Sequence, residues 1–180
     1  MNLDELSDLA EINGVLFRYC RGLDRMDKEL TRSCWHTDGT DDHAPLFVGT
    51  ADDFLEWLWP VHAGMELTRH MVTNVVVDLR GDRAGTECYW SLTFRTATDA
   101  GSVDTQSGGR YVDMFERRDG VWAITHRRSI REWSRTDAVL EPTDPAKGQR
   151  LIEAHSPGAE VTSPARDRSD YSYTALRTTH

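Results

Sequence analysis

This 180-residue chain changes from helical to strand periodicity at about Thr68. From there on, β-branched and aromatic residues gather in runs where apolar and polar residues alternate, a pattern that favours strands over helices. Two turn signals, RGDR and the stronger RRDGVW with its Asp119–Gly120 pair, indicate tight hairpins. A longer flexible loop is predicted over TDAGSVDTQSGG. The pattern therefore predicts an antiparallel meander, built from TRHMVTNVVVDLR, RAGTECYWSLTFRTA, GRYVDMFERR and VWAITHRRSIREWSR.

Helical patterns precede these strands. In NLDELSDLAEINGVLFRYCRGLD the apolar residues recur in steps of three and four, and acidic residues occupy the first turns, where the helix dipole favours them. A short second helix is expected over about residues 28–35. A third is expected over TADDFLEWLWPVHAGM, capped by Thr50 and bent or ended by Pro60. The stretch HTDGTDDHAP is a loop by composition. Helices followed by antiparallel strands predict an α+β fold.

The periodicity is lost after Arg135. Residues 136–180 are rich in Pro, Ser, Thr, Asp and Arg, with one short helical candidate at AKGQRLIEAH. Such a composition predicts an extended arm or a disordered tail. We therefore expect one domain over residues 1–135 and a C-terminal arm or tail over residues 136–180.

Charge and cysteine usage exclude several classes of protein. The net charge of −9 argues against a nucleic-acid or anionic membrane surface, which would need clustered positive charge. Three cysteines without a CxxC pair make a disulfide framework improbable. An apolar run near the roughly 20 residues of a membrane span is absent, as is a signal-peptide pattern. A reduced, cytoplasmic protein that binds neither nucleic acid nor membrane is expected.

The common cofactor and nucleophile motifs are also absent. Without GxGxxG, a P-loop or GxSxG, hydride transfer, phosphoryl transfer and serine hydrolysis are disfavoured, and we expect no cofactor. The segment HTDGTDDH carries His36, Asp38, Asp41, Asp42 and His43, but it lacks the spacing of a calcium loop. An acidic turn is the better interpretation, so no metal site is expected. His62, after Pro60, has no evident partner and is expected to be structural.

The order of elements resembles the SnoaL-like branch of the NTF2-like superfamily. The likeness is carried by YCRGLD, the central RHMVTN strand and the terminal ERRDGVW hairpin, and it covers residues 3 to 135. It implies a cone of N-terminal helices packed on a curved, mainly antiparallel β-sheet. The subset most similar includes scytalone dehydratase, bile acid 7α-dehydratase and hexachlorocyclohexane dehydrochlorinase. Related folds host isomerases, cyclases and proteins without chemistry, so the fold alone does not decide the reaction.

The resemblance implies that Asp24, just past the first helix, faces His70 on the concave side of the sheet. A carboxylate that accepts from one ring nitrogen fixes the tautomer and stabilises the imidazolium formed when the other nitrogen takes a proton. From the residues alone, an Asp in a turn beside a structural His is the alternative. Tyr19, about one helical turn earlier, could donate a hydrogen bond from its phenol or simply fill the core.

Strict alternation along the last strand places its residues on two faces. The resemblance aligns Arg127 with an arginine of the dehydrochlorinase-like members that neutralises a departing anion; a surface arginine is the alternative. Thr125, Ser129 and Arg131 would share its face, whereas Trp122, Ile124, His126, Arg128 and Ile130 would share the other.

Candidate substrate contacts come from the strands and the tryptophans. The resemblance implies that Tyr111 lines the pocket, and Asn74, four residues past His70, would lie on the same strand face. The tryptophans Trp35, Trp57, Trp59 and Trp90 could wall a pocket for an aromatic substrate or fill the core. We assign Trp35, Trp59 and Trp90 to substrate binding.

These features together predict a cofactor-independent lyase that dehydrates, or otherwise eliminates across, a carbon–carbon bond of a small to medium apolar cyclic or aromatic substrate. Its catalytic residues would be Asp24, His70, Tyr19 and Arg127. Isomerisation or cyclisation with the same Asp–His dyad is the alternative, and a non-catalytic binding module is a third reading. The resemblance also implies a homo-oligomer, dimer or trimer, formed through the convex sheet face, to which Trp122, Ile124 and Ile130 would contribute.

Overall fold

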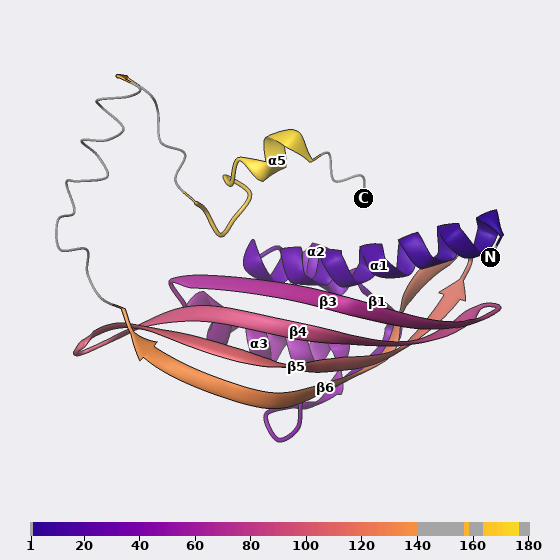
Figure 1. Ribbon diagram of the computed structural model, residues 1–180, viewed down its shortest axis with the longest axis horizontal. Coiled ribbons are helices and arrows are strands. Elements are labelled where there is room, and N and C mark those ends of the chain that lie inside the picture. The colour runs from indigo at the N-terminus through magenta and orange to yellow at the C-terminus, as the bar shows by residue number, and fades with distance from the viewer. Residues whose placement is uncertain (1, 140–156, 159–163, 177–180) are drawn as a thin grey trace.

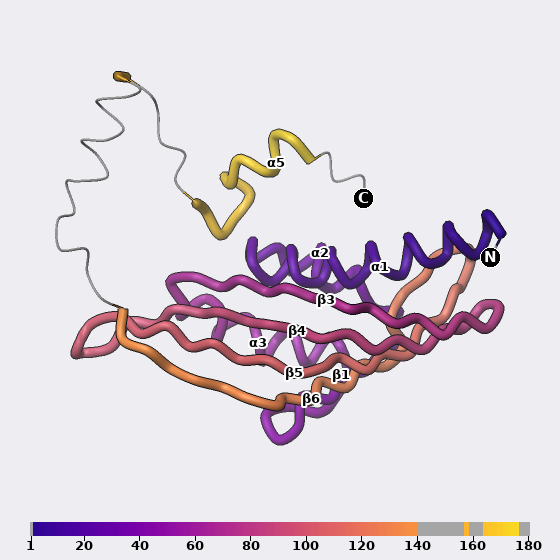
Figure 2. The backbone as a smooth tube through the Cα atoms, viewed as in Figure 1, coloured from indigo at the N-terminus to yellow at the C-terminus, as the bar shows by residue number. Residues whose placement is uncertain are grey.

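A curved sheet of long strands forms the centre of the computed structural model, which describes residues 2–139, 157–158 and 164–176 (Figures 1 and 2). Neighbouring strands are antiparallel except for β1 and β6, which are parallel. The order across the sheet is β2-β1-β6-β5-β4-β3. The strands are β1 (Trp35–Asp42), β2 (Val48–Thr50), β3 (Leu67–Arg80), β4 (Arg83–Thr98), β5 (Gly101–Arg118) and β6 (Val121–Ala138).

Two-residue turns join the long strands, and those between β3 and β4 and between β5 and β6 are the ones that the sequence predicts. At the β5–β6 turn, Asp119 and Gly120 both have positive φ, +52° and +79°, the left-handed backbone that a tight hairpin loop of this kind requires. Gly81 at the β3–β4 turn has φ +63°. Both hairpin predictions are confirmed.

Two predicted loops are strands instead. Most of TDAGSVDTQSGG belongs to β5, which pairs with β4 from Gly101 onward, so only a tight turn separates the two strands. Most of HTDGTDDHAP belongs to β1, which lies between β2 and β6. Polar, turn-forming residues favoured loops in both cases. Pairing with a neighbouring strand on each side overrides this local preference.

The helices begin and end close to their predicted bounds. Helix α1 (Leu3–Asp24) starts with a capping box in which Asn2 and Glu5 bond each other's backbone N–H groups. Helix α2 spans Lys28–Arg32, and α3 (Ala51–Ala63) is capped by Thr50 as expected. Pro60 does not end α3, which continues to Ala63. The pyrrolidine φ fits a helix, and Leu58 and His62 on either side of it stay buried.

A one-residue bulge in β6 changes which side chains point inward. Met114 is paired with His126 and Phe115 with Ile124, so Thr125 is the extra residue. Trp122 and Ile124 therefore share the inner face with Arg127, and all three are almost completely buried. The prediction that Trp122 and Ile124 lie on an outer contact face is wrong, because it assumed strict alternation. Ile130 is half-buried.

The core lies between α1, α3 and the inner face of the sheet. Helix α1 runs alongside β3 and contacts β6, while α3 contacts β1 and β2 (Figure 1). Trp122 packs under α1, where its indole N–H donates to Asp8 at 2.9 Å. In the described part of the chain, no helix is both long and apolar enough to cross a membrane.

A short C-terminal segment, residues 164–176, packs on the ends of the helices and contains α5 (Ser172–Ala175), drawn above α1 and α2 in Figure 1. Tyr173 donates a hydrogen bond to Asp27 at 2.9 Å, and Arg166 donates to the carbonyl oxygens of His62 and Met65. The predicted helix AKGQRLIEAH lies outside the described residues.

Candidate active site

Asp24 and His70 form a hydrogen-bonded pair where α1 ends beside β3. The Nδ1 atom of His70 lies 2.7 Å from Asp24 Oδ1, and the backbone N–H of His70 donates to both carboxylate oxygens, at 2.9 and 3.1 Å. A carboxylate only accepts, so the proton of the neutral imidazole resides on Nδ1. Nε2 has no hydrogen-bond partner among the described residues. The pair therefore presents one basic nitrogen.

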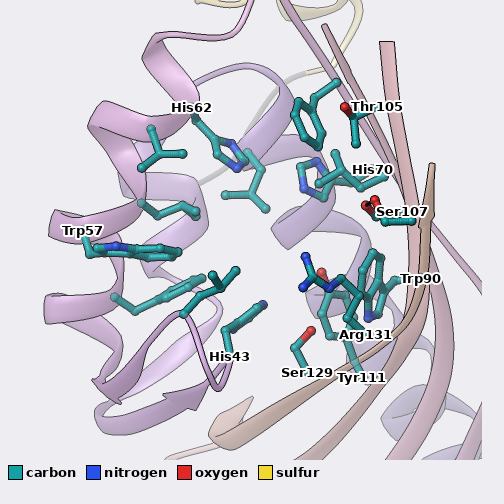
Figure 3. Close-up of a pocket in the computed structure, with 18 of the residues that line it drawn as sticks. His43, Trp57, His62, His70, Trp90, Thr105, Ser107, Tyr111, Ser129 and Arg131 are labelled. Carbon is teal, nitrogen blue, oxygen red and sulfur yellow. Dashed lines mark hydrogen bonds between the residues drawn. The ribbon is translucent and has the colours of Figure 1, made fainter. Parts of the chain in front are cut away.

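His70 lines a cavity of about 380 Å³ between α3 and the inner face of the sheet (Figure 3). The lining is mostly apolar and aromatic, with a few hydroxyls on β5 and β6. Asp24 lies outside this cavity and, with His70, lines a shallower hollow between α1 and β3. His70 thus has one nitrogen toward the cavity and its partner near solvent. The apolar lining includes Phe54, Trp57, Leu58, Val61, Trp90, Leu92, Phe94 and Tyr111, and the hydroxyls are those of Thr105, Ser107, Ser129 and Ser134.

His62 faces His70 across the end of the cavity, with ring centroids 5.6 Å apart and planes at 23° (Figure 3). Burial, followed by the positive charges of His70, Arg166 and His43, lowers the pKa of His62 to about 3. The ring is therefore neutral in the folded protein. Its Nδ1 is buried without a hydrogen-bond partner among the described residues.

Tyr19 and Tyr111 lie at the floor of the cavity with a buried cation behind them. Their rings meet edge to face with centroids 5.8 Å apart. The guanidinium carbon of Arg127 lies 4.2 Å from the Tyr19 ring centroid and 4.1 Å from that of Tyr111. Burial raises the pKa of both phenols above the ordinary value, so they are hydrogen-bond donors rather than anions.

Arg127 is fully buried and paired with Asp113, with N–O distances of 2.8 and 2.7 Å. Burial alone would lower the pKa of Arg127, but the Asp113 carboxylate raises it well above its usual value. The guanidinium is not part of the cavity lining. The tyrosine rings and Asp113 occupy its faces and edge, so the predicted direct contact with a departing anion is not what this geometry offers.

Three predicted substrate contacts do not line the cavity. Trp35 is buried in the core against Tyr19, and Trp59 is not among the lining residues. Asn74 is exposed, because a bulge between Thr73 and Val76, with Asn74 at φ +54°, reverses the inward–outward alternation of β3 beyond His70. Tyr111 and Trp90 do line it, stacked at a centroid distance of 5.7 Å.

The cavity also contains residues that the sequence argument did not assign to it. His62 lies on the face of α3 formed by residues 54, 57, 58, 61 and 62, whose spacing in steps of three and four was visible in the sequence. Trp57, which was considered as a pocket wall but not assigned to substrate binding, lies on the same face. Arg131 lines the cavity two residues past Ser129 on β6. His43, considered only as a metal ligand, lies beside Phe54 and contacts Asp41. Its place in the cavity was missed because the turn-forming residues of HTDGTDDHAP led to the prediction of a loop there.

Three carboxylates of β1 pair with three different side chains. Asp38 pairs with Arg118, Asp42 with Arg128, and Asp41 with His43. Among the described residues, no group of three or more His, Cys, Asp or Glu side chains is arranged to hold a metal ion.

The fold is the NTF2-like α+β cone, and comparison with known proteins gives the family. The family model for a SnoaL-like domain matches residues 4–128, so the chain belongs to the SnoaL-like family. No curated protein matches the sequence.

Solved structures with the same fold include enzymes. A protein of unknown function from Mycobacterium tuberculosis is 25% identical with a TM-score of 0.60, covering 72% of this chain and 74% of that one. A hexachlorocyclohexane dehydrochlorinase is 19% identical with a TM-score of 0.70, covering 81% and 99%. A putative scytalone dehydratase from Novosphingobium aromaticivorans is 20% identical with a TM-score of 0.66, covering 79% and 95%. The dehydrochlorinase and the putative dehydratase share the fold with this chain.

Proposed function

We propose that this protein is a lyase that eliminates a leaving group across a carbon–carbon bond of a small to medium cyclic or aromatic molecule. The observation that carries the proposal is the 2.7 Å contact between His70 Nδ1 and Asp24 Oδ1 at the wall of an apolar cavity. Membership of the SnoaL-like family and the likeness to a dehydrochlorinase and a putative dehydratase support it.

His70 acts as the general base. Its Nε2 takes a proton from a carbon beside a carbonyl, and the Asp24 carboxylate stabilises the imidazolium that results. The two backbone hydrogen bonds to Asp24 keep the carboxylate aligned with the ring. Because the cavity that His70 lines is mostly apolar, interactions between its ring and a bound substrate are stronger there than in water.

Tyr19 assists the developing negative charge. Its neutral phenol lines the cavity and is a donor suited to an enolate oxygen. Arg127 contributes from behind the rings of Tyr19 and Tyr111. Its buried positive charge stabilises negative charge that develops on their phenol oxygens when they donate to the substrate. Tyr111 and Trp90 offer a flat aromatic wall for a cyclic substrate.

The experiment is turnover of a hydroxytetralone, a bicyclic ketone with its hydroxyl β to the carbonyl, followed by product mass. Elimination gives a naphthol and releases water. We expect naphthol formation by the wild type and a loss of about 100-fold or more in His70→Ala, with Asp24→Asn also impaired. A product of unchanged mass would indicate isomerisation instead. Ligand binding without turnover would indicate a non-catalytic module.

A further inference from the structure

A second Asp–His pair belongs to the same cavity. His43 follows β1 directly, lines the cavity, and its Nδ1 hydrogen-bonds Oδ1 of Asp41. Resting on the proposed function, we propose that His43 is the general acid that protonates the leaving group, and that this leaving group is a hydroxyl.

The ring of His43 is held in a fixed position. It stacks on Phe54 with a centroid distance of 4.7 Å and an angle of 14°, and it meets Tyr111 edge-on at 6.2 Å. Its backbone closes a turn, donating to Phe47 O at 2.8 Å and accepting from Leu46 N at 2.9 Å. Asp41 engages Nδ1. Nε2 is therefore the nitrogen available to a substrate, and the side chain keeps 18% of its surface exposed.

The carboxylates of Asp24 and Asp41 differ in their hydrogen bonds. Both oxygens of Asp24 accept from the backbone N–H of His70, and Oδ1 also accepts from its imidazole. Asp41 is fully buried, and its Oδ2 has no hydrogen-bond partner in the part of the chain that is described. A buried carboxylate is costly unless a cation compensates it. The imidazolium form of His43 supplies this compensation, which suits His43 to donate a proton and His70 to accept one.

The two imidazoles occupy different ends of the cavity. In Figure 3, His70 lies with His62 at one end of the cavity, whereas His43 lies at the other end. A substrate between them would present its acidic carbon to one ring and its leaving group to the other. The charged or titratable groups around His43 are Asp41 on β1, Tyr111 on β5, Arg131 and Arg127 on β6, and His62 on α3.

The step balances without a co-reactant. Nε2 of His70 takes the proton from the carbon beside the ketone, and the C–H electron pair becomes the new carbon–carbon double bond. The carbon–oxygen bond breaks, and the leaving oxygen takes the proton of His43 Nε2 and departs as water. His70 is then protonated and His43 neutral, and exchange with solvent restores both. No electrons enter or leave the site.

A hydroxyl needs this second acid and a better leaving group does not. Hydroxide leaves poorly unless it is protonated, whereas acetate departs as a stable anion. General acid catalysis typically contributes about 10²–10⁴-fold to a rate. If His43 is the acid, replacing it should slow elimination from the hydroxy substrate strongly and elimination from an ester of the same ring very little.

The test compares the hydroxytetralone with its acetate ester in wild type, His43→Gln, His70→Ala and His126→Gln. Gln at position 43 can still donate to Asp41. His126 is the matched control, because it bonds Thr40 at 2.8 Å and does not line the cavity. We expect His43→Gln to lose about 100-fold or more on the hydroxy substrate and less than about 5-fold on the ester. His70→Ala should lose activity on both, and His126→Gln on neither.

Asp41→Asn tests whether Asp41 holds His43 in position for this role. Activity on the hydroxy substrate should fall, while activity on the ester should change little. Equal losses of His43→Gln on both substrates, or no loss on either, would overturn the role of His43. If His70→Ala also retained full activity on both substrates, the proposed function itself would fall.

Discussion

The ring of His62 is stacked on the ring of His70 with centroids 5.6 Å apart, so the proposed base has an uncharged imidazole as its neighbour. A second cation at this distance would oppose protonation of His70. Burial keeps the pKa of His62 at about 3, which removes that conflict over the range in which His70 would work. His62 thus adds a polar ring to this end of the cavity without adding a charge.

Stability should therefore depend on pH through His62. In the unfolded chain a histidine titrates near pKa 6.5, and in the folded protein His62 titrates at about 3. Below about pH 6.5 the unfolded state binds a proton that the folded state does not, so the free energy of unfolding falls by up to about 1.4 kcal/mol per pH unit until about pH 3. Above that range His62 contributes no pH dependence.

His62→Leu removes this component while filling the same space. Urea unfolding of the variant across the same range should show a shallower acid decline than the wild type, with the two curves parallel above about pH 7. If both proteins lost stability with the same slope between about pH 6.5 and 3, His62 would not be the buried neutral group described here.

The Arg127–Asp113 pair should be costly to break and much less costly to replace. Both side chains are completely buried, so Asp113→Asn leaves a cation without its partner and should lower the free energy of unfolding by about 3–5 kcal/mol. The double variant Arg127→Met with Asp113→Leu should recover most of that loss. Arg110→Ala, which removes an exposed pair with Glu132, is the control and should change stability little. A double variant no more stable than Asp113→Asn would contradict the argument.

Tyr19→Phe separates the phenol from the ring. The ring contacts with Trp35 and Arg127 remain, so the free energy of unfolding should change by only about 1 kcal/mol. Loss of a donor to developing charge should lower kcat by about 100-fold, with a smaller effect on KM. Steady-state kinetics on the hydroxytetralone would measure this. An unchanged kcat would make Tyr19 a core residue only.

Arg166 should matter for stability although it lies in the C-terminal segment. It donates to the carbonyls of His62 and Met65 and to Thr68 Oγ1, so it ties the end of α3 to the start of β3. Arg166→Ala should reduce the free energy of unfolding by about 2 kcal/mol, and Arg166→Lys should not restore it, since a lysine cannot reach several acceptors at once. Equal stability of all three proteins would show that the segment adds nothing to the fold.

The regular parts of the fold could be predicted because local rules and packing agree there. The apolar face of α1, the Thr50 cap of α3 and the Asp119–Gly120 turn each follow from a few neighbouring residues. The relation of Asp24 to His70 came from the family resemblance. Periodicity alone places neither residue beside the other.

The misplaced residues trace to bulges and to strand pairing. The extra residues at Thr125 in β6 and at Asn74 in β3 each reverse the alternation beyond them, which brought Trp122 into the core and turned Asn74 to solvent. Nothing local in the sequence marks the bulge at Thr125. Strand β1 was taken as a loop because its polar residues are stabilised by pairing with β2 and with β6, and β6 lies far along the chain. His43 was missed with it.

The most direct test of the account is hydrogen–deuterium exchange at the carbon beside the ketone of plain tetralone, which has no leaving group. Only proton removal is then observed. The account predicts that the wild type catalyses exchange and that His70→Gln loses it by about 100-fold or more, while His43→Gln keeps it. Exchange that persists at the wild-type rate in His70→Gln would contradict the claim that His70, held by Asp24, removes the proton.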